Sequence, residues 1–199
     1  MLKYNGRIIT KNDRWIGDYI PPLPENTIRL RYKAGTTPSF SKGTGVCIDS
    51  KNNIWDLTYN DSSWRYLLDS HTDLVEVIDG QTTNVTDMLD MFWGCTSLES
   101  VAVFDTSNVT NMGYMFVRCT SLKHVPLFNT SSLTMMFGMF QDCRNVESGM
   151  YDLYLQTSSQ ANVPSHNTYT FGGCGTLTES GRAERALIPQ SWGGDLVEE

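Results

Sequence analysis

The sequence has few charged residues and no long apolar run, and each absence narrows the possible functions. Charged residues make up 19% of the chain, whereas glycine, serine, threonine and asparagine are abundant, which favours turns and short strands over long helices. No run approaches the roughly 18 apolar residues of a membrane-spanning helix, so we expect no membrane span. The first seven residues lack the apolar run of a secretory signal, and we therefore expect synthesis in the cytoplasm.

Recognisable catalytic and metal-binding motifs are also missing. None of the three histidines lies in a nucleophile or metal motif, and no two of the five cysteines have C-x-x-C spacing. Structural thiols are favoured over disulfides and over metal ligands, because three cysteines follow an apolar pattern. These three recur at 24-residue intervals: Cys95, Cys119 and Cys143. We therefore expect no enzyme, no cofactor and no metal.

The net charge of −7 is distributed unevenly. Residues 1–33 hold seven lysines and arginines against three acidic residues, a balance of +4, so the remainder carries −11. This argues against nucleic-acid binding by the main body. The amino-terminal segment is either a solvated tail or an arm that docks onto an acidic assembly. Its candidate docking residues are Lys3, Arg7, Lys11, Arg14 and Trp15.

An internal repeat is the strongest signal in the sequence. The segments 82–105, 106–129 and 130–153 align without gaps, and matching methionines, phenylalanines and cysteines are offset by 24 residues. The same register extends with weaker identity to 58–81, which predicts four repeats over 58–153. Beyond this point the pattern dissolves, although 170–177 resembles one more decayed copy.

Within each repeat, two apolar periods predict two kinds of element. Four residues have the i, i+3, i+4, i+7 spacing of one helical face: Met88, Met91, Phe92 and Cys95. Val101 and Val103 then alternate with outward positions, as in a strand. Stacked copies would bury both faces. The prediction is an α+β repeat fold, a right-handed leucine-rich-repeat-like solenoid with short parallel strands and short helical turns.

The flanks divide the rest of the chain. Residues 1–25 are predicted to be a basic arm followed by a proline-rich linker, and 26–57 a β-rich amino-terminal cap. In the cap, Ile28, Leu30 and Tyr32 alternate with basic residues, as in a half-exposed strand. Residues 154–199 are predicted to contain an insertion, the degenerate repeat and a carboxyl-terminal cap.

The repeat resembles a known family. The stretch FDTSNVTNMGYMFVRCTSL at 104–122 is similar to the BspA-like leucine-rich repeats, which also occur in Mycoplasma surface lipoproteins. The resemblance implies adhesion or recognition at a cell or virion surface. The opening YNGRIITKNDRWI and the closing ALIPQSWGG resemble phage- and prophage-encoded proteins.

Together these resemblances imply a non-enzymatic, virion-associated structural or recognition protein, such as part of a tail or head fibre. It would dock through its amino-terminal arm onto other virion proteins, as a homo-oligomer or in a larger assembly. A bacterial cell-surface, adhesin-like repeat protein is the alternative.

The candidate interaction surface lies where the repeats differ while keeping register. Exposed aromatic residues supply rigid contact area, so they are suited to a host surface glycan or protein. The alternative is that these side chains pack under neighbouring loops. The candidates are Trp93, Tyr114, Lys123 and His124.

Overall fold

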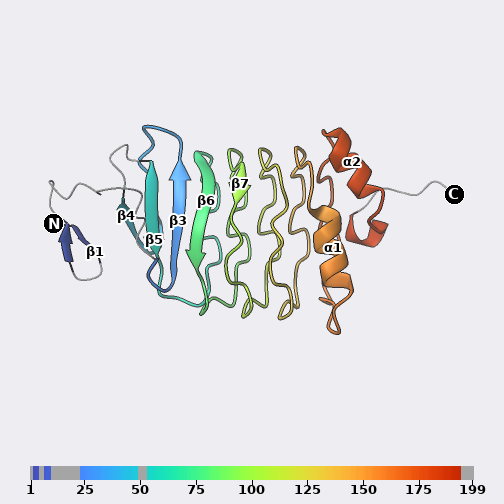
Figure 1. Ribbon diagram of the computed structural model, residues 1–199, viewed down its shortest axis with the longest axis horizontal. Helices are drawn as coiled ribbons and strands as arrows, with labels where there is room; N and C mark the ends of the chain where they lie inside the picture. The colour runs from blue at the N-terminus through green and yellow to red at the C-terminus, as the bar shows by residue number, and fades with distance from the viewer. Residues whose placement is uncertain (1, 5–6, 10–22, 49–52, 194–199) are drawn as a thin grey trace.

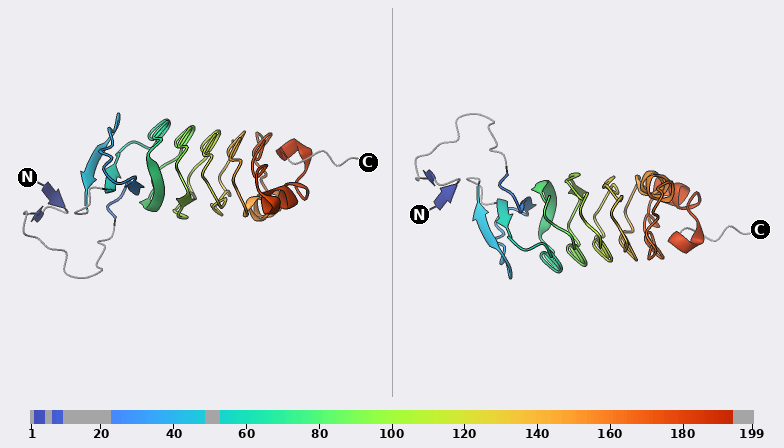
Figure 2. Two further views of the ribbon diagram at one scale, coloured as in Figure 1. Left: turned by 90° about the horizontal axis from the view of Figure 1, so that it is seen from above. Right: turned by 90° about the horizontal axis from the view of Figure 1, so that it is seen from below.

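A five-stranded mixed sheet lies toward one end of a row of stacked loops, and two short helices lie at the other end (Figures 1 and 2). The structure, a computed structural model, describes residues 2–4, 7–9, 23–48 and 53–193. The strand order in the sheet is β4-β5-β3-β6-β7. In chain order its strands are β3 (Thr27–Tyr32), β4 (Thr44–Cys47), β5 (Ile54–Thr58), β6 (Leu74–Gln81) and β7 (Ser100–Val101).

The amino terminus contributes a separate two-stranded unit. β1 (Leu2–Tyr4) pairs antiparallel with β2 (Arg7–Ile9). Of the expected docking residues, Lys3 therefore lies in β1 and Arg7 at the start of β2, while Lys11, Arg14 and Trp15 lie outside the described residues.

The central strand β3 forms where the apolar alternation predicted it. Ile28, Leu30 and Tyr32 are buried, and Arg31 is exposed. Arg29, expected to face outward, is instead only 2% exposed, because it is aligned with Asp56 on β5 and forms an ion pair with it.

The sheet also joins the segment predicted as the amino-terminal cap to the repeat region. β6 pairs antiparallel with β3, and β7 pairs parallel with β6. The segment predicted as a β-rich cap, 26–57, supplies β3, β4 and nearly all of β5, and the sheet continues from it into the repeat region. The physical reason is that the edge of β3 carries backbone donors and acceptors that β6 satisfies.

The helical piece expected in each repeat is absent. Residues 82–99 form turns and one bridge, without an α-helix. The backbone φ is +54° at Asp90 and +71° at Gly94, and a left-handed residue at both positions is incompatible with a right-handed helix. The apolar residues at helical spacing are nonetheless buried: Met88, Met91, Phe92 and Cys95.

Backbone hydrogen bonds show what replaces the helix. The N–H of Asp90 donates to the carbonyl of Gly113 at 3.1 Å, and that of Phe92 donates to Met115 at 2.9 Å. Between them, the N–H of Met91 donates three residues back, to Met88, at 3.2 Å. Every second donor therefore reaches the next segment, and the chain zigzags through tight turns that place apolar side chains inward at helix-like spacing.

These observations overturn the predicted solenoid of parallel strands and helical turns. The regular structure is a mixed sheet with two short helices, and β7 is the sole strand within 82–149. Val125 and Leu127 lie outside strands, since Pro126 between them cannot donate a hydrogen bond. Isolated bridges such as Asp87 with Asn111 occur instead of continuous ladders.

The core is filled by matching side chains of successive segments. Ring centroids are 5.2 Å apart for Phe92 and Phe116, 5.1 Å for Phe116 and Phe140, and 6.0 Å for Phe140 and Phe171, with nearly parallel planes. Four of the five cysteines are fully buried free thiols, Cys95, Cys119, Cys143 and Cys174, and Cys47 is half-buried.

Buried thiols of the repeats donate hydrogen bonds to backbone carbonyls of the preceding segment. Cys119 Sγ donates to the carbonyl of Phe92 at 3.2 Å, and Cys143 Sγ donates to that of Phe116 at 2.9 Å.

Helices α1 (Met150–Ser158) and α2 (Glu179–Arg185) and the 3-10 turn η1 (Gln190–Trp192) follow the repeats. α1 starts after Gly149, which offers no side-chain cap. Instead the carboxylate of Glu184 on α2 accepts hydrogen bonds from the N–H groups of Gly149, Met150 and Tyr151 at 3.2, 2.8 and 3.2 Å. One side chain thus caps α1 and joins it to α2. No helix in the described part of the chain has the length and apolar character needed to cross a bilayer.

Candidate recognition surface

A row of tyrosines projects from the zigzag face of the molecule. Tyr66, Tyr114 and Tyr169 are 48%, 37% and 56% exposed. Each has a left-handed backbone, with φ between +54° and +56°, and Asp90 and Gly138 occupy the intervening positions with φ of +54° and +59°. These five residues are hereafter the tyrosine row. Because the backbone conformations match, the side chains of the three tyrosines and Asp90 leave the chain in the same direction.

Backbone hydrogen bonds hold the row together. Consecutive members lie on neighbouring segments: the N–H of Tyr66 donates to Leu89, next to Asp90, at 3.1 Å, and the N–H of Tyr114 donates to Phe137, next to Gly138, at 2.9 Å. The N–H of Gly138 in turn donates to Thr168, next to Tyr169, at 3.1 Å. The row is therefore set by the backbone and does not depend on flexible side chains.

In the carboxyl-terminal half of the tyrosine row, the aromatic rings contact one another without a gap. Phe137 lies edge-to-face with Tyr114 at 5.2 Å between centroids and with Tyr169 at 6.0 Å. A Cβ on Gly138 would lie 3.0 Å from the Tyr114 ring. The glycine therefore leaves the space in which that ring rests.

In the amino-terminal half of the tyrosine row, the carboxylate of Asp90 separates the rings of Tyr66 and Tyr114. Asp90 is half-buried and lies between Tyr66 and Tyr114 in the row. Burial raises the pKa of its carboxyl above the ordinary value. The negative charge of Asp69 adds to this increase, and the positive charge of Arg65 opposes it. A desolvated carboxylate in this position is a strong hydrogen-bond acceptor.

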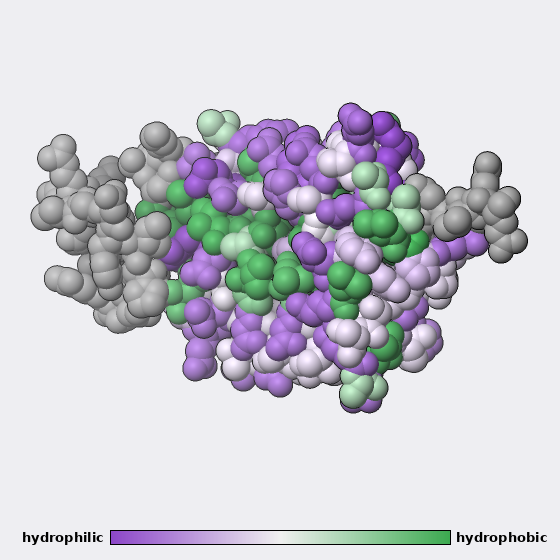
Figure 3. Space-filling view, turned by 45° about the vertical axis from the view of Figure 1, so that its right-hand side comes forward, coloured by the Kyte–Doolittle hydropathy of each residue, from purple (hydrophilic) through white to green (hydrophobic). Residues whose placement is uncertain are grey.

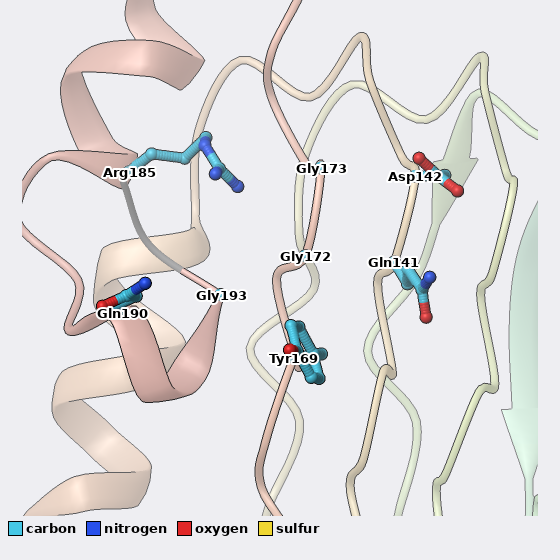
Figure 4. Close-up of a pocket in the computed structure, with 8 residues that line it drawn as sticks. All are labelled: Gln141, Asp142, Tyr169, Gly172, Gly173, Arg185, Gln190 and Gly193. Atoms are coloured by element: carbon cyan, nitrogen blue, oxygen red, sulfur yellow. The ribbon is translucent and has the colours of Figure 1, made fainter. Parts of the chain in front are cut away.

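Trp93 and Tyr114, two of the predicted interaction residues, belong to this face. The Trp93 ring is partly covered by the guanidinium of Arg118, whose Cζ lies 5.9 Å from the ring centroid. Trp93 is in register with Gln141, which lies beside Tyr169 in Figure 4. Sequence reasoning missed Tyr66 and Tyr169, although the 48-residue offset between Tyr66 and Tyr114 was a usable signal.

The structure separates Lys123 and His124, the other two predicted residues, from this face. They are in register with Glu99 and Ser100, at the start of β7. Lys123 Nζ pairs with the Glu147 carboxylate at 3.3 Å, and His124 Nδ1 lies 2.7 Å from the Ser148 hydroxyl. These four predicted residues therefore do not form one site.

An apolar patch occupies the side of the molecule that carries β6 and β7 (Figure 3). Val103 and Leu127 are 59% and 47% exposed and occupy matching positions of neighbouring segments, and Leu155 on α1 is also exposed. These three side chains are aliphatic and carry no polar group, unlike the tyrosines and Asp90 of the tyrosine row.

A small cavity lies at the carboxyl-terminal end of the tyrosine row (Figure 4). Its volume is about 320 Å³. The Arg185 guanidinium at its wall donates to the carbonyls of Phe171 at 2.7 Å and Cys174 at 3.3 Å. The cavity is lined by Gln141, Asp142, Tyr169, Gly172, Gly173, Arg185, Gln190 and Gly193.

The amino-terminal basic excess is smaller than the sequence suggested. Arg29 pairs with Asp56 at 2.7 Å, Arg31 with Glu76 at 3.2 Å and Lys33 with Asp73 at 3.3 Å, so these three cations belong to the body. The basic residues left for a docking arm are those before residue 15.

Across the described ranges, no group of three or more histidine, cysteine, aspartate or glutamate side chains is arranged to hold a metal ion. His71 lies beside Tyr32, with its Nδ1 2.7 Å from the tyrosine hydroxyl. Burial lowers the pKa of His71, and the nearby Asp69 charge acts in the opposite direction.

Comparison with known proteins finds one family. The model described as "Mycoplasma protein of unknown function, DUF285" matches residues 66–172, more than half of the chain and the whole tyrosine row from Tyr66 to Tyr169. No curated protein and no solved structure matches the chain.

Proposed function

Since this chain belongs to the family described as Mycoplasma protein of unknown function, DUF285, which is related to the BspA-like surface repeats, we propose that it is a non-enzymatic recognition protein. It binds its target through the tyrosine row. The family match covers the residues that form this surface, so the proposal concerns the shared part of the family's sequence.

The observation that carries the proposal is the alignment of Tyr66, Tyr114 and Tyr169 at equivalent left-handed positions, all exposed. A tyrosine in that conformation is unfavourable by about 1–2 kcal/mol relative to a right-handed one. Large aromatic side chains on a surface supply rigid contact area at low cost in side-chain entropy. A rigid array of them is a property expected of a binding face.

The proposed location is the virion of a phage or prophage. In this proposal the arm of residues 1–25 docks on an acidic partner protein of the particle, with Lys3, Arg7, Lys11 and Arg14 as its cations. The repeat region is then displayed outward, in a homo-oligomer or a larger assembly. The support is the difference in charge between the two parts: residues 1–25 hold four basic and three acidic residues, a net charge of +1, whereas the remainder of the chain carries −8.

A bacterial cell-surface, adhesin-like role is the second candidate. The relation of the family to surface repeats favours it. Both candidates use the tyrosine row for recognition and differ in what the rest of the chain is attached to.

Two measurements test the proposal. Mass spectrometry of purified phage particles and of cell envelopes from the source organism shows where the chain resides at fixed stoichiometry. Fluorescently labelled protein is then applied to candidate target cells, with Tyr114→Asn as the test variant and Leu127→Ala as the control. We expect Tyr114→Asn to lose binding to the cells, and Leu127→Ala to bind as the native chain does. Equal binding by all three proteins would exclude recognition through the tyrosine row.

A further inference from the structure

We infer that the tyrosine row and the cavity beside Tyr169 together form a binding site for an extended β-1,4-linked carbohydrate chain. This inference rests on the proposed recognition function and names the chemical class of its ligand. The row contacts successive sugar rings, and the cavity takes the sugar at the end of the chain.

The spacing of the row is the first argument. Neighbouring segments joined by backbone hydrogen bonds lie about 4.8 Å apart, and the row has one member on each of five such segments. Tyrosines occupy every second position, with Asp90 and Gly138 between them. Their side chains are therefore repeated at about 9.6 Å by the same backbone spacing, which is close to the length of two pyranose rings in an extended β-1,4-linked chain. A regular polymer would meet an equivalent tyrosine at every second sugar.

The chemistry of the row is the second argument. Tyrosine offers an apolar ring for the C–H face of a sugar and a hydroxyl for its polar edge. The half-buried Asp90 carboxylate accepts hydrogen bonds, as sugar hydroxyls require. At Gly138 the Tyr114 ring rests on the backbone, and Phe137 joins it to Tyr169, so the aromatic surface is continuous there. An apolar peptide would bury more of its apolar surface against the patch around Val103 and Leu127, on the β6–β7 side.

The cavity provides the third argument. A volume of about 320 Å³ is at the small end of ligand sites, which span about 300–1,000 Å³. Gln141, Asp142 and Gln190 supply amide and carboxylate groups, and Tyr169 connects the cavity to the row (Figure 4). Glycines 172 and 173 present backbone without side chains, so a ring can approach closely. These features suit one terminal sugar.

Isothermal titration calorimetry with defined hexasaccharides tests the inference. We expect cellohexaose or chitohexaose, both β-1,4-linked, to bind at least tenfold more tightly than maltohexaose, whose α-linkage curves the chain. Affinity should increase from the disaccharide to the hexasaccharide, whose rings cover the five members of the row and the cavity, and then level off. Failure of both β-linked hexasaccharides to bind would overturn the inference.

Variants assign the binding to the site. Asparagine tolerates the left-handed conformation, so Tyr66→Asn, Tyr114→Asn and Tyr169→Asn remove a ring with little strain. Each should weaken hexasaccharide binding about tenfold, in line with the contribution of one stacked aromatic ring. Gln141→Ala should weaken binding of the hexasaccharide through the cavity, whereas Leu127→Ala should have no effect. Unchanged binding by the triple tyrosine variant would also overturn the inference.

The result separates this inference from the proposed function. If no β-linked hexasaccharide binds and Tyr114→Asn still abolishes binding to cells, recognition through the row stands and the carbohydrate is rejected in favour of a protein target. If Tyr114→Asn changes neither hexasaccharide binding nor binding to cells, both proposals fail.

Discussion

Arg29 and Asp56 face each other across β3 and β5 and form a bidentate ion pair that is almost completely shielded from solvent. Arg29 Nε lies 2.7 Å from Asp56 Oδ1, and Nη2 lies 2.9 Å from Oδ2. The pair holds a buried cation in the central strand of the sheet, at a position where alternation alone predicted an exposed side chain.

Removing only the cation should be strongly destabilising, because it leaves the Asp56 carboxylate buried without its partner. Arg29→Met should lower the free energy of unfolding by about 3–5 kcal/mol, and the double variant with Asp56→Leu should recover most of this loss. Urea denaturation followed by circular dichroism measures both. Arg31→Met is the matched control: its pair with Glu76 is half-exposed, so a loss below about 1 kcal/mol is expected. Equal losses for the two single variants would contradict this account.

His71 should make folding stability depend on pH. Its pKa in the folded protein is lowered from an ordinary value of 6.5, chiefly by burial, so the unfolded chain binds a proton more readily. The stabilising contribution is therefore present above about pH 6.5 and is lost as the pH falls toward the lower folded pKa. Chemical denaturation between about pH 7 and 5 should show a steeper loss for the native chain than for His71→Gln. His124→Gln, which changes an exposed histidine, should behave like the native chain.

The cap that Glu184 supplies to α1 can be tested by removing its carboxylate. Glu184→Ala should lower the free energy of unfolding by about 1–2 kcal/mol, since three backbone N–H groups lose their acceptor. Hydrogen exchange should accelerate at Met150 and Tyr151 in particular. Glu179→Gln, an exposed change in the first turn of α2, should leave exchange at these amides unaltered. Slow exchange in Glu184→Ala would show that the cap is dispensable.

The cysteines should differ sharply in reactivity. Burial raises the pKa of Cys95 to about 12 and raises that of Cys119 and Cys174 as well, and a thiol reacts through its thiolate. Against the effect of burial, hydrogen bonds with Cys119 and Cys174 lower the pKa of Cys143, but its sulfur is fully buried, so a reagent does not reach it in the folded protein. Titration of the native protein with a disulfide reagent should modify Cys47 first, and the other four only on unfolding. Cys47→Ser should abolish the fast phase. A second fast thiol in that variant would show that the buried cysteines are accessible.

The sequence identified the inward-facing positions better than it identified the backbone that carries them. Phe92, Phe116 and Phe140 were placed in register and do stack. The same spacing predicted a helix, which was wrong, because apolar periodicity reports which side chains face the core and not which hydrogen bonds are made. A zigzag with left-handed residues at Asp90 and Gly94 produces the same spacing.

The recognition surface was only partly accessible to sequence reasoning. Tyr114 was named as a candidate, but Tyr66 and Tyr169 were not, since neither sits in a well-preserved copy of the repeat. Lys123 and His124 were grouped with them because they also vary between repeats, whereas the structure places them at the register of β7. Position within a repeat determines the face, and variation alone does not.

The dependence of α1 on Glu184 has a consequence for synthesis of the protein. A chain emerging from the ribosome presents residues 150–158 before the carboxylate that caps them has been translated. Until residue 184 leaves the exit tunnel, the amino-terminal amides of α1 have water as their acceptor. During this time α2 is not yet packed against α1. The capping of α1 is thus deferred until α2 has been translated, and a chain interrupted between the two helices lacks it.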